Sequence, residues 1–133
     1  MAANVFVIAG IIVALFQFFQ SKRSEKVQNA INAINQTRSD EFLKAYARLK
    51  TAYNTGQAAD QVTLIDDLNY VTNTYDNTAL LYINDLADRC VIRKAMFSTV
   101  QELASIYDKV SVPKEYRQNI DKFLDQMKNE NCD

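Results

Sequence analysis

The segment from Val5 to Phe19 constrains the fold more than any other part of the sequence, because it is apolar and contains no charged residue. It reads VFVIAGIIVALFQFF, and Gln17 is its one polar side chain. A surface helix of a soluble core would carry a polar face, which this segment lacks. Its eleven Val, Ile, Leu and Phe residues together favour membrane insertion by about 3–7 kcal/mol. The segment therefore predicts a single transmembrane helix.

The expected anchor covers residues 1–20, because the apolar run alone is short. Fifteen helical residues span about 22 Å, whereas the hydrocarbon core of a bilayer is about 30 Å thick. A cleaved signal peptide is the alternative, but MAAN carries no basic side chain and FFQSKR offers no small-residue cleavage site. The side chains expected to contact lipid are Val5, Phe6, Ile8, Ile11, Ile12, Leu15, Phe16, Phe18 and Phe19.

Basic residues next to the anchor predict its orientation. Lys22, Arg23 and Lys26 follow the span against a single Glu25, and no basic side chain precedes it. The positive-inside rule then puts the N-terminus outside and the C-terminal domain in the cytoplasm. We expect these three basic side chains to lie at the membrane surface of a cell inner membrane.

Scarce glycine and proline predict that the remainder is all-α. The chain has two Gly and one Pro, whereas hairpins and sheets need frequent turn residues of these types. Residues 21–38 predict a helical stalk, and residues 39–133 predict a small antiparallel bundle of four helices. Expected helix starts are Ser39 or Asp40, Asp60 and Pro113, with a turn near Ala87 and Asp88. The apolar face of the stalk comprises Val27, Ala30, Ile31 and Ile34.

The bundle core is predicted from apolar residues at spacings of three and four. On the long second helix this stripe consists of Ile65, Leu68, Thr72, Tyr75, Ala79, Tyr82, Ile83 and Leu86. The residues expected to meet in one core are Leu68, Tyr75, Ala79, Tyr82, Met96, Val100, Leu103, Ile120 and Phe123. Tyrosines in such a core need partners for their hydroxyls, and Thr72 and Asp76 are candidates.

The composition disfavours catalysis, metal binding and nucleic-acid binding. The formal net charge is −1 and the chain has no histidine, so it lacks both a basic field and the commonest metal ligand and general base. Phosphate-binding loops, nucleophile elbows and zinc-ligand spacings are missing from the sequence as well. We therefore expect no enzyme activity, no cofactor and no nucleic-acid partner.

Two cysteines and several acidic residues have structural explanations. Cys90 and Cys132 form no CxxC pair, which fits two reduced thiols in a cytoplasmic domain better than a disulfide scaffold. Asp66 and Asp67 are expected on a solvated face. Asp85, Asp88 and Arg89 suit capping and closure of a turn. Asp76 lies beside the apolar stripe, so we expect its carboxylate to be hydrogen-bonded to a tyrosine, arginine or lysine.

Two short segments, FFQSKR at residues 18–23 and TNTYDNTALLY at residues 72–82, resemble the bacterial family of membrane-anchored helical proteins catalogued as domain of unknown function 4760. Phe18-Phe19-Gln20-Ser21-Lys22-Arg23 is similar to the family's juxtamembrane stretch. Residues 72–82, TNTYDNTALLY, are similar to a later family motif, with Thr72 where Leu is usual and Asp76 where Glu is usual. The acidic turn Leu86-Ala87-Asp88 follows, and Asp85 stands where Gly is common. The resemblance implies a membrane-anchored helical protein and supplies no activity.

The function expected from these features is a non-enzymatic, single-pass membrane-anchored interaction or assembly subunit. Its partners would be the bilayer and a protein, either another protein or further copies of itself. Asp76, Tyr75 and Asn73 are candidate interaction residues, because they lie in the family-like segment. The alternative is a small membrane-active effector, related to phage defence or lysis, that oligomerises through the span. Ala9, Gly10 and Ala14 would permit close helix packing there, but the span has no charge to line a water path.

Overall fold

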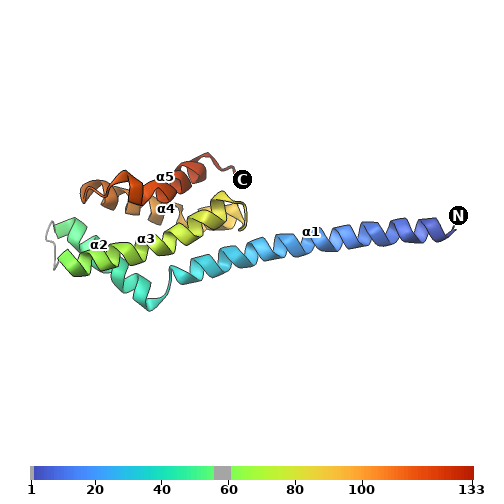
Figure 1. The fold of residues 1–133 in the computed structure, drawn as a ribbon, viewed down its shortest axis with the longest axis horizontal. Helices are drawn as coiled ribbons and strands as arrows, with labels where there is room; N and C mark the ends of the chain where they lie inside the picture. The colour runs from blue at the N-terminus through green and yellow to red at the C-terminus, as the bar shows by residue number, and fades with distance from the viewer. Residues whose placement is uncertain (1, 56–60) are drawn as a thin grey trace.

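The computed structural model describes residues 2–55 and 61–133, which form five helices and no strands. The predicted all-α class is therefore confirmed, with a long apolar N-terminal helix followed by helices that pack together. Figure 1 shows the N-terminal helix extending as a single rod away from the other four. The helices are α1 (Ala2–Gln36), α2 (Asp40–Thr55), α3 (Gln61–Ile83), α4 (Arg89–Lys109) and α5 (Lys114–Asn129).

Helix α1 has two halves with different environments. Its first half is exposed from Asn4 onward, whereas its last two turns pack against α3 and α4. Ala30, Ala33 and Ile34 are buried there, so two of the four residues predicted for the apolar face of the stalk, Ala30 and Ile34, belong to the bundle core. Of the other two, Val27 is partly exposed and Ile31 is 41% exposed.

The core lies between α3 and the helices that surround it. Helix α3 packs against α2, α5 and α1, and α4 packs against α5 and α1. Figure 1 shows the chain reversing direction from α2 to α3, α3 to α4 and α4 to α5, so α3 and α5 run in the same direction. Eight of the nine predicted core residues are buried, and Leu68 is partly buried against them.

The buried face of α3 is wider than the predicted stripe, and two positions of the stripe lie outside it. Ile65 and Leu86 are 55% and 53% exposed, whereas Val71 and Thr78 are 0% and 1% exposed. The prediction for Ile65 and Leu86 is therefore wrong. Because α3 has neighbours on more than one side, its buried arc is wider than a single stripe and extends to positions that a two-helix contact would leave in solvent.

Side-chain caps define several helix ends, as predicted. Ser39 Oγ accepts a hydrogen bond from the Phe42 amide at the start of α2, and Asp88 Oδ1 accepts one from the Val91 amide at the start of α4. Arg89 donates to the carbonyl oxygens of Tyr82 and Ile83, which end α3. The expected cap at Asp60 lies outside the described residues.

Candidate functional site

The predicted anchor is one uninterrupted helix with little burial inside the protein. Its large apolar side chains are between 50% and 79% exposed. This helix is long and apolar enough to cross a membrane, by length and composition. All nine side chains assigned to lipid contact, from Val5 to Phe19, are among the exposed ones. A continuous, uncharged apolar surface of this kind is compatible with anchoring in a bilayer.

The junction between the anchor helix and the bundle is built around Lys26. Its Nζ lies 2.9 Å from Asp85 Oδ2, and its carbonyl oxygen accepts a hydrogen bond from the Asp88 amide. Asn29 Nδ2 donates to the Leu86 carbonyl oxygen at 2.7 Å. These contacts fix the turn between α3 and α4 to the helix that leaves the bundle. They also hold the pKa of Asp85 below its usual value, because Lys26 stabilises the carboxylate.

The other two basic residues predicted for the membrane surface lie nearer the apolar segment. Lys22 Nζ is 5.8 Å from the centre of the Phe18 ring and 3.8 Å from Glu25. Arg23 is exposed beside a shallow polar surface that includes Gln20, Ser21 and Ser24. Lys26, in contrast, is paired with Asp85 of the bundle, so Lys22 and Arg23 carry the basic charge next to the apolar segment that the bundle does not neutralise.

The three candidate interaction residues on α3 do not share one surface. Tyr75 is 1% exposed and belongs to the core, where its ring meets Phe42 edge-on at 5.4 Å. Asn73 is exposed, and Asp76 is half-buried. Asp76 Oδ1 is buried and has no hydrogen-bond partner in the described residues, so the predicted bond to that oxygen is wrong. Burial raises the pKa of Asp76 as a result.

Tyrosine hydroxyls find partners elsewhere in the bundle. The Tyr46 hydroxyl donates to Glu102 at 3.0 Å, and the Tyr82 hydroxyl donates to Glu130 at 3.3 Å. Tyr107 is bonded to Thr72, as predicted. Burial is the main reason that the pKa of Tyr107 is raised to about 12. These tyrosine rings pack in or against the bundle core, and their hydroxyls stay protonated at neutral pH.

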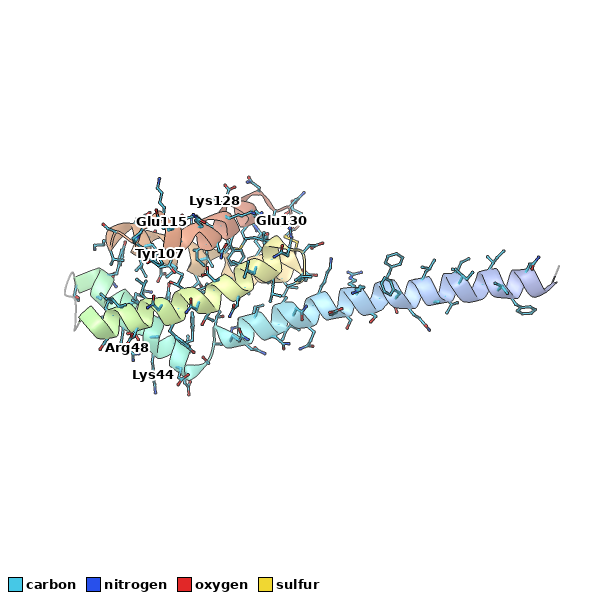
Figure 2. The ribbon with its side chains drawn as sticks, viewed as in Figure 1. Lys44, Arg48, Tyr107, Glu115, Lys128 and Glu130 are labelled. Carbon is cyan, nitrogen blue, oxygen red and sulfur yellow. A yellow bond between two sulfur atoms is a disulfide. The ribbon has the colours of Figure 1, made fainter. Side chains whose placement is uncertain are left out.

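A buried carboxylate on α3, paired with an exposed arginine of α2, differs from the prediction of a solvated face. Asp67 is 6% exposed, and the Arg48 guanidinium binds both its oxygens at 2.7 Å. Arg48 and Lys44 come from α2 (Figure 2), and they line a groove together with Asp66 and Tyr70 of α3. Asp66 is exposed, as predicted. Arg48 follows Glu41 by seven residues in a helix with many charged side chains. Nothing in this local pattern indicated that Arg48 would bind Asp67 of the next helix.

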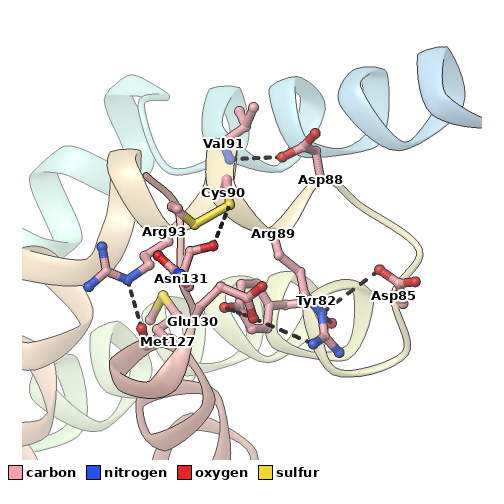
Figure 3. The surroundings of a disulfide bond; sticks show 11 residues. Tyr82, Asp85, Asp88, Arg89, Cys90, Val91, Arg93, Met127, Glu130 and Asn131 are labelled. Atoms are coloured by element: carbon pink, nitrogen blue, oxygen red, sulfur yellow. Dashed lines mark hydrogen bonds and ion pairs between the residues drawn. A yellow bond between two sulfur atoms is a disulfide. The ribbon is translucent and has the colours of Figure 1, made fainter.

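The two cysteines are joined in a disulfide, which corrects the prediction of reduced thiols. Their Cα atoms are 5.4 Å apart although 42 residues separate them in the chain. Figure 3 shows the bond linking the start of α4 to the tail beyond α5, close to Arg89 and Arg93. Arg93 Nε donates to the Met127 carbonyl oxygen at 2.7 Å, and Arg89 lies 3.5 Å from Glu130.

Metal binding has no evident site in the described part of the chain. Within those residues, no group of three or more His, Cys, Asp or Glu side chains is placed to hold an ion. The surface grooves are open and lined by mixed polar side chains, among them the amides of Asn29, Asn32 and Asn77 between α1 and α3. The two most distinctive features are thus the exposed apolar helix and the cysteine pair.

Comparison with known proteins agrees with the resemblance noted in the sequence. A family model described as Domain of unknown function (DUF4760) matches residues 4–128, which cover the apolar helix from Asn4 and the bundle up to Lys128 of α5. No curated protein and no solved structure matches the chain significantly. The family description names no activity.

Proposed function

We propose that this chain, which belongs to the family described as domain of unknown function 4760, is a single-pass membrane-anchored interaction subunit without enzyme activity. The observation that carries this proposal is the exposed apolar half of α1, which continues without a break into the bundle. Exposed apolar surface on this scale is otherwise a liability in water. A bilayer removes it from water.

The continuity of α1 also positions the bundle. Lys26 follows Phe19 by seven residues, which is about 10 Å along a helix axis. The contacts of Lys26 with Asp85 and Asp88 would therefore hold the bundle immediately below the head groups in one orientation. A flexible linker would leave that orientation free. We infer that the bundle presents a fixed face to a partner at the membrane.

The basic residues favour the cytoplasmic side of an inner membrane for the bundle. Lys22 and Arg23 follow the apolar segment and remain exposed, where they can interact with anionic head groups. A reporter fused to the C-terminus tests the orientation. A cytoplasmic reporter such as a fluorescent protein is expected to be active, and an alkaline phosphatase fusion at the same position is expected to be inactive.

Site-specific photo-crosslinking tests the interaction role. A photo-reactive amino acid replaces Asn73, which is exposed on α3 in the family-like segment, and a matched variant carries it at Tyr116, which is 72% exposed on α5. We expect one discrete crosslinked protein from the Asn73 position, identified by mass spectrometry. Equal products from both positions, in chains that remain in the membrane, would contradict a defined partner face on α3.

Self-assembly through the span, the membrane-active alternative, has a specific observation in its favour. A Cβ added at Gly10 would meet no atom within 4 Å, so this surface is open, and the amide of exposed Gln17 lies on the same helix. Interhelical hydrogen bonds and small residues both favour association in lipid. Gly10→Leu should then reduce crosslinked oligomers in vesicles, and dye release from those vesicles would distinguish a pore from a passive assembly.

A further inference from the structure

The cysteine pair combines features that make a thiol reactive. Cys90 is the second residue of α4, directly after Arg89, and both cysteines are partly exposed at the edge of the bundle. Cys132 lies in the tail after α5, within bonding distance of Cys90. A partly exposed cysteine next to a second one can be oxidised and then resolved as a disulfide. The pair therefore has both groups that a thiol–disulfide reaction requires.

The electrostatic surroundings favour a thiolate at Cys90 rather than at Cys132. The first turn of a helix presents the positive end of the peptide dipoles and unpaired amides. Arg89 precedes Cys90, although its charge is shared with Glu130 and Asp85. Arg93 follows one turn later and binds the Met127 carbonyl oxygen and the ring of Phe97, so no carboxylate among the described residues pairs with its charge.

We propose that Cys90 and Cys132 form a reversible thiol–disulfide exchange site for low-molecular-weight disulfides of the glutathione type. Cys90 is the attacking thiolate, and Cys132 is the resolving thiol. Reversibility in the cell follows from the proposed cytoplasmic orientation, because the cytoplasmic thiol pool keeps structural disulfides rare and leaves transient, redox-responsive ones. The proposal thus depends on that part of the proposed function and adds a modification site to it.

Oxidation proceeds in two exchange steps with balanced atoms and electrons. The Cys90 thiolate attacks one sulfur of glutathione disulfide, so a mixed disulfide forms and one glutathione thiolate leaves. Cys132 loses its proton to solvent and attacks the Cys90 sulfur, which releases the second glutathione thiolate. The two protein thiols lose two electrons and two protons in total, and the reagent is reduced to two thiols. Excess glutathione reverses both steps.

The structural consequence is a covalent lock on the C-terminal tail. In the oxidised form shown in Figure 3, the bond joins Cys132 to the start of α4. In the reduced form the tail would keep only non-covalent contacts, chiefly those of Glu130 with Arg89 at 3.5 Å and with the Tyr82 hydroxyl at 3.3 Å. Oxidation therefore fixes the end of the chain beside the junction that holds the bundle to α1.

Single-cysteine variants of the detergent-solubilised full chain test the assignment of roles. Reduced Cys132→Ser is expected to accumulate a mixed disulfide at Cys90 when treated with glutathione disulfide. Cys90→Ser should react at Cys132 about threefold more slowly, because the larger thiolate fraction expected at Cys90 is only partly offset by its lower nucleophilicity. Circular dichroism checks that both variants are folded. Equal rates, or reaction only after denaturation, would overturn the assignment.

Trapping the thiols in cells tests reversibility. Acid quenching followed by a maleimide label should find the wild-type pair reduced in untreated cells and oxidised after a pulse of diamide. A pair that is fully oxidised before treatment would overturn the proposal and indicate a permanent disulfide on the exported side of the membrane. Pelleting of membranes from the same cells reports separately on anchoring, so failure of the exchange site is distinguishable from failure of the proposed function.

Discussion

At the scale of single residues, Asp76 is a carboxylate whose environment disfavours its charge. Burial raises its pKa, so the native state retains the proton to a higher pH than the unfolded chain does. Between those two pKa values the native state binds more protons, and the free energy of unfolding falls as the pH rises. Asp76→Asn should therefore raise the Tm at pH 7 by up to about 3 °C.

The pH dependence distinguishes this explanation from a general effect of substitution. Below the usual pKa of an aspartate, both states are protonated and the stabilisation by Asp76→Asn should disappear. Thermal unfolding of the full chain in detergent, followed by circular dichroism at both pH values, measures this. Asp66→Asn, at an exposed position of the same helix, is the matched control and should change little. A lower Tm for Asp76→Asn at pH 7 would show that the carboxylate has a stabilising partner.

Arg48 and Asp67 present the opposite case, a buried carboxylate whose charge is compensated. Arg48→Met would leave Asp67, 6% exposed, without its partner, and we expect a loss of about 1–3 kcal/mol in the free energy of unfolding. The double variant Arg48→Met with Asp67→Leu should recover most of that loss, because no buried charge remains. Lys50→Met, which removes an exposed contact with Glu102, is the control and should cost less than about 0.5 kcal/mol.

At the scale of helices, a pair of truncations tests which side chains of the bundle are buried. Leu103 on α4 is 0% exposed, whereas Ile65 on α3 is 55% exposed. Leu103→Ala should lower the free energy of unfolding by about 2–5 kcal/mol, and Ile65→Ala should change it by less than about 0.5 kcal/mol. Denaturant unfolding measures both. Similar losses in the two variants would mean that Ile65 is buried. The sequence pattern predicted this, but the structure shows Ile65 exposed.

The disulfide closes the hairpin formed by α4 and α5, and the length of that closed loop determines how much the bond stabilises the chain. Closing a loop across 42 residues restricts the unfolded chain, so the oxidised form should exceed Cys132→Ser in free energy of unfolding by up to about 4 kcal/mol. Under reducing conditions the two proteins should unfold alike. Parallel melts with and without reductant test this, and a difference that persists in reductant would have to come from packing of the Cys132 side chain.

At the scale of the whole molecule, the sequence predicted the features that depend on local pattern. The long apolar helix, the helix boundaries and most of the core follow from helical spacing and capping residues. The disulfide between Cys90 and Cys132 could not be predicted from local spacing, because it depends on how α4 and α5 fold back on each other. A signal was present nonetheless: positions 90 and 132 are equidistant from Ser111, the residue with φ of 57° in the turn between α4 and α5.

The environments of the candidate interaction residues were harder to predict than the apolar helix. Residues 73–76 share a motif-like segment, but successive helical positions point in different directions. Tyr75 is therefore buried while Asn73 faces solvent. Asp67 was misplaced for the same reason as Ile65, since contacts from several helices decide the buried arc of α3. Long-range packing, rather than local spacing, sets these side-chain environments.

Extraction of membranes with alkaline carbonate tests the central claim, that α1 anchors the bundle in a bilayer. The wild-type chain should remain in the membrane pellet, as should Ile65→Lys, which adds a charge to the exposed surface of the bundle. Ile12→Lys, in the middle of the apolar segment, should shift the chain largely to the supernatant, because it costs about 3–4 kcal/mol of insertion free energy. Release of the wild-type chain by carbonate would contradict the transmembrane anchor.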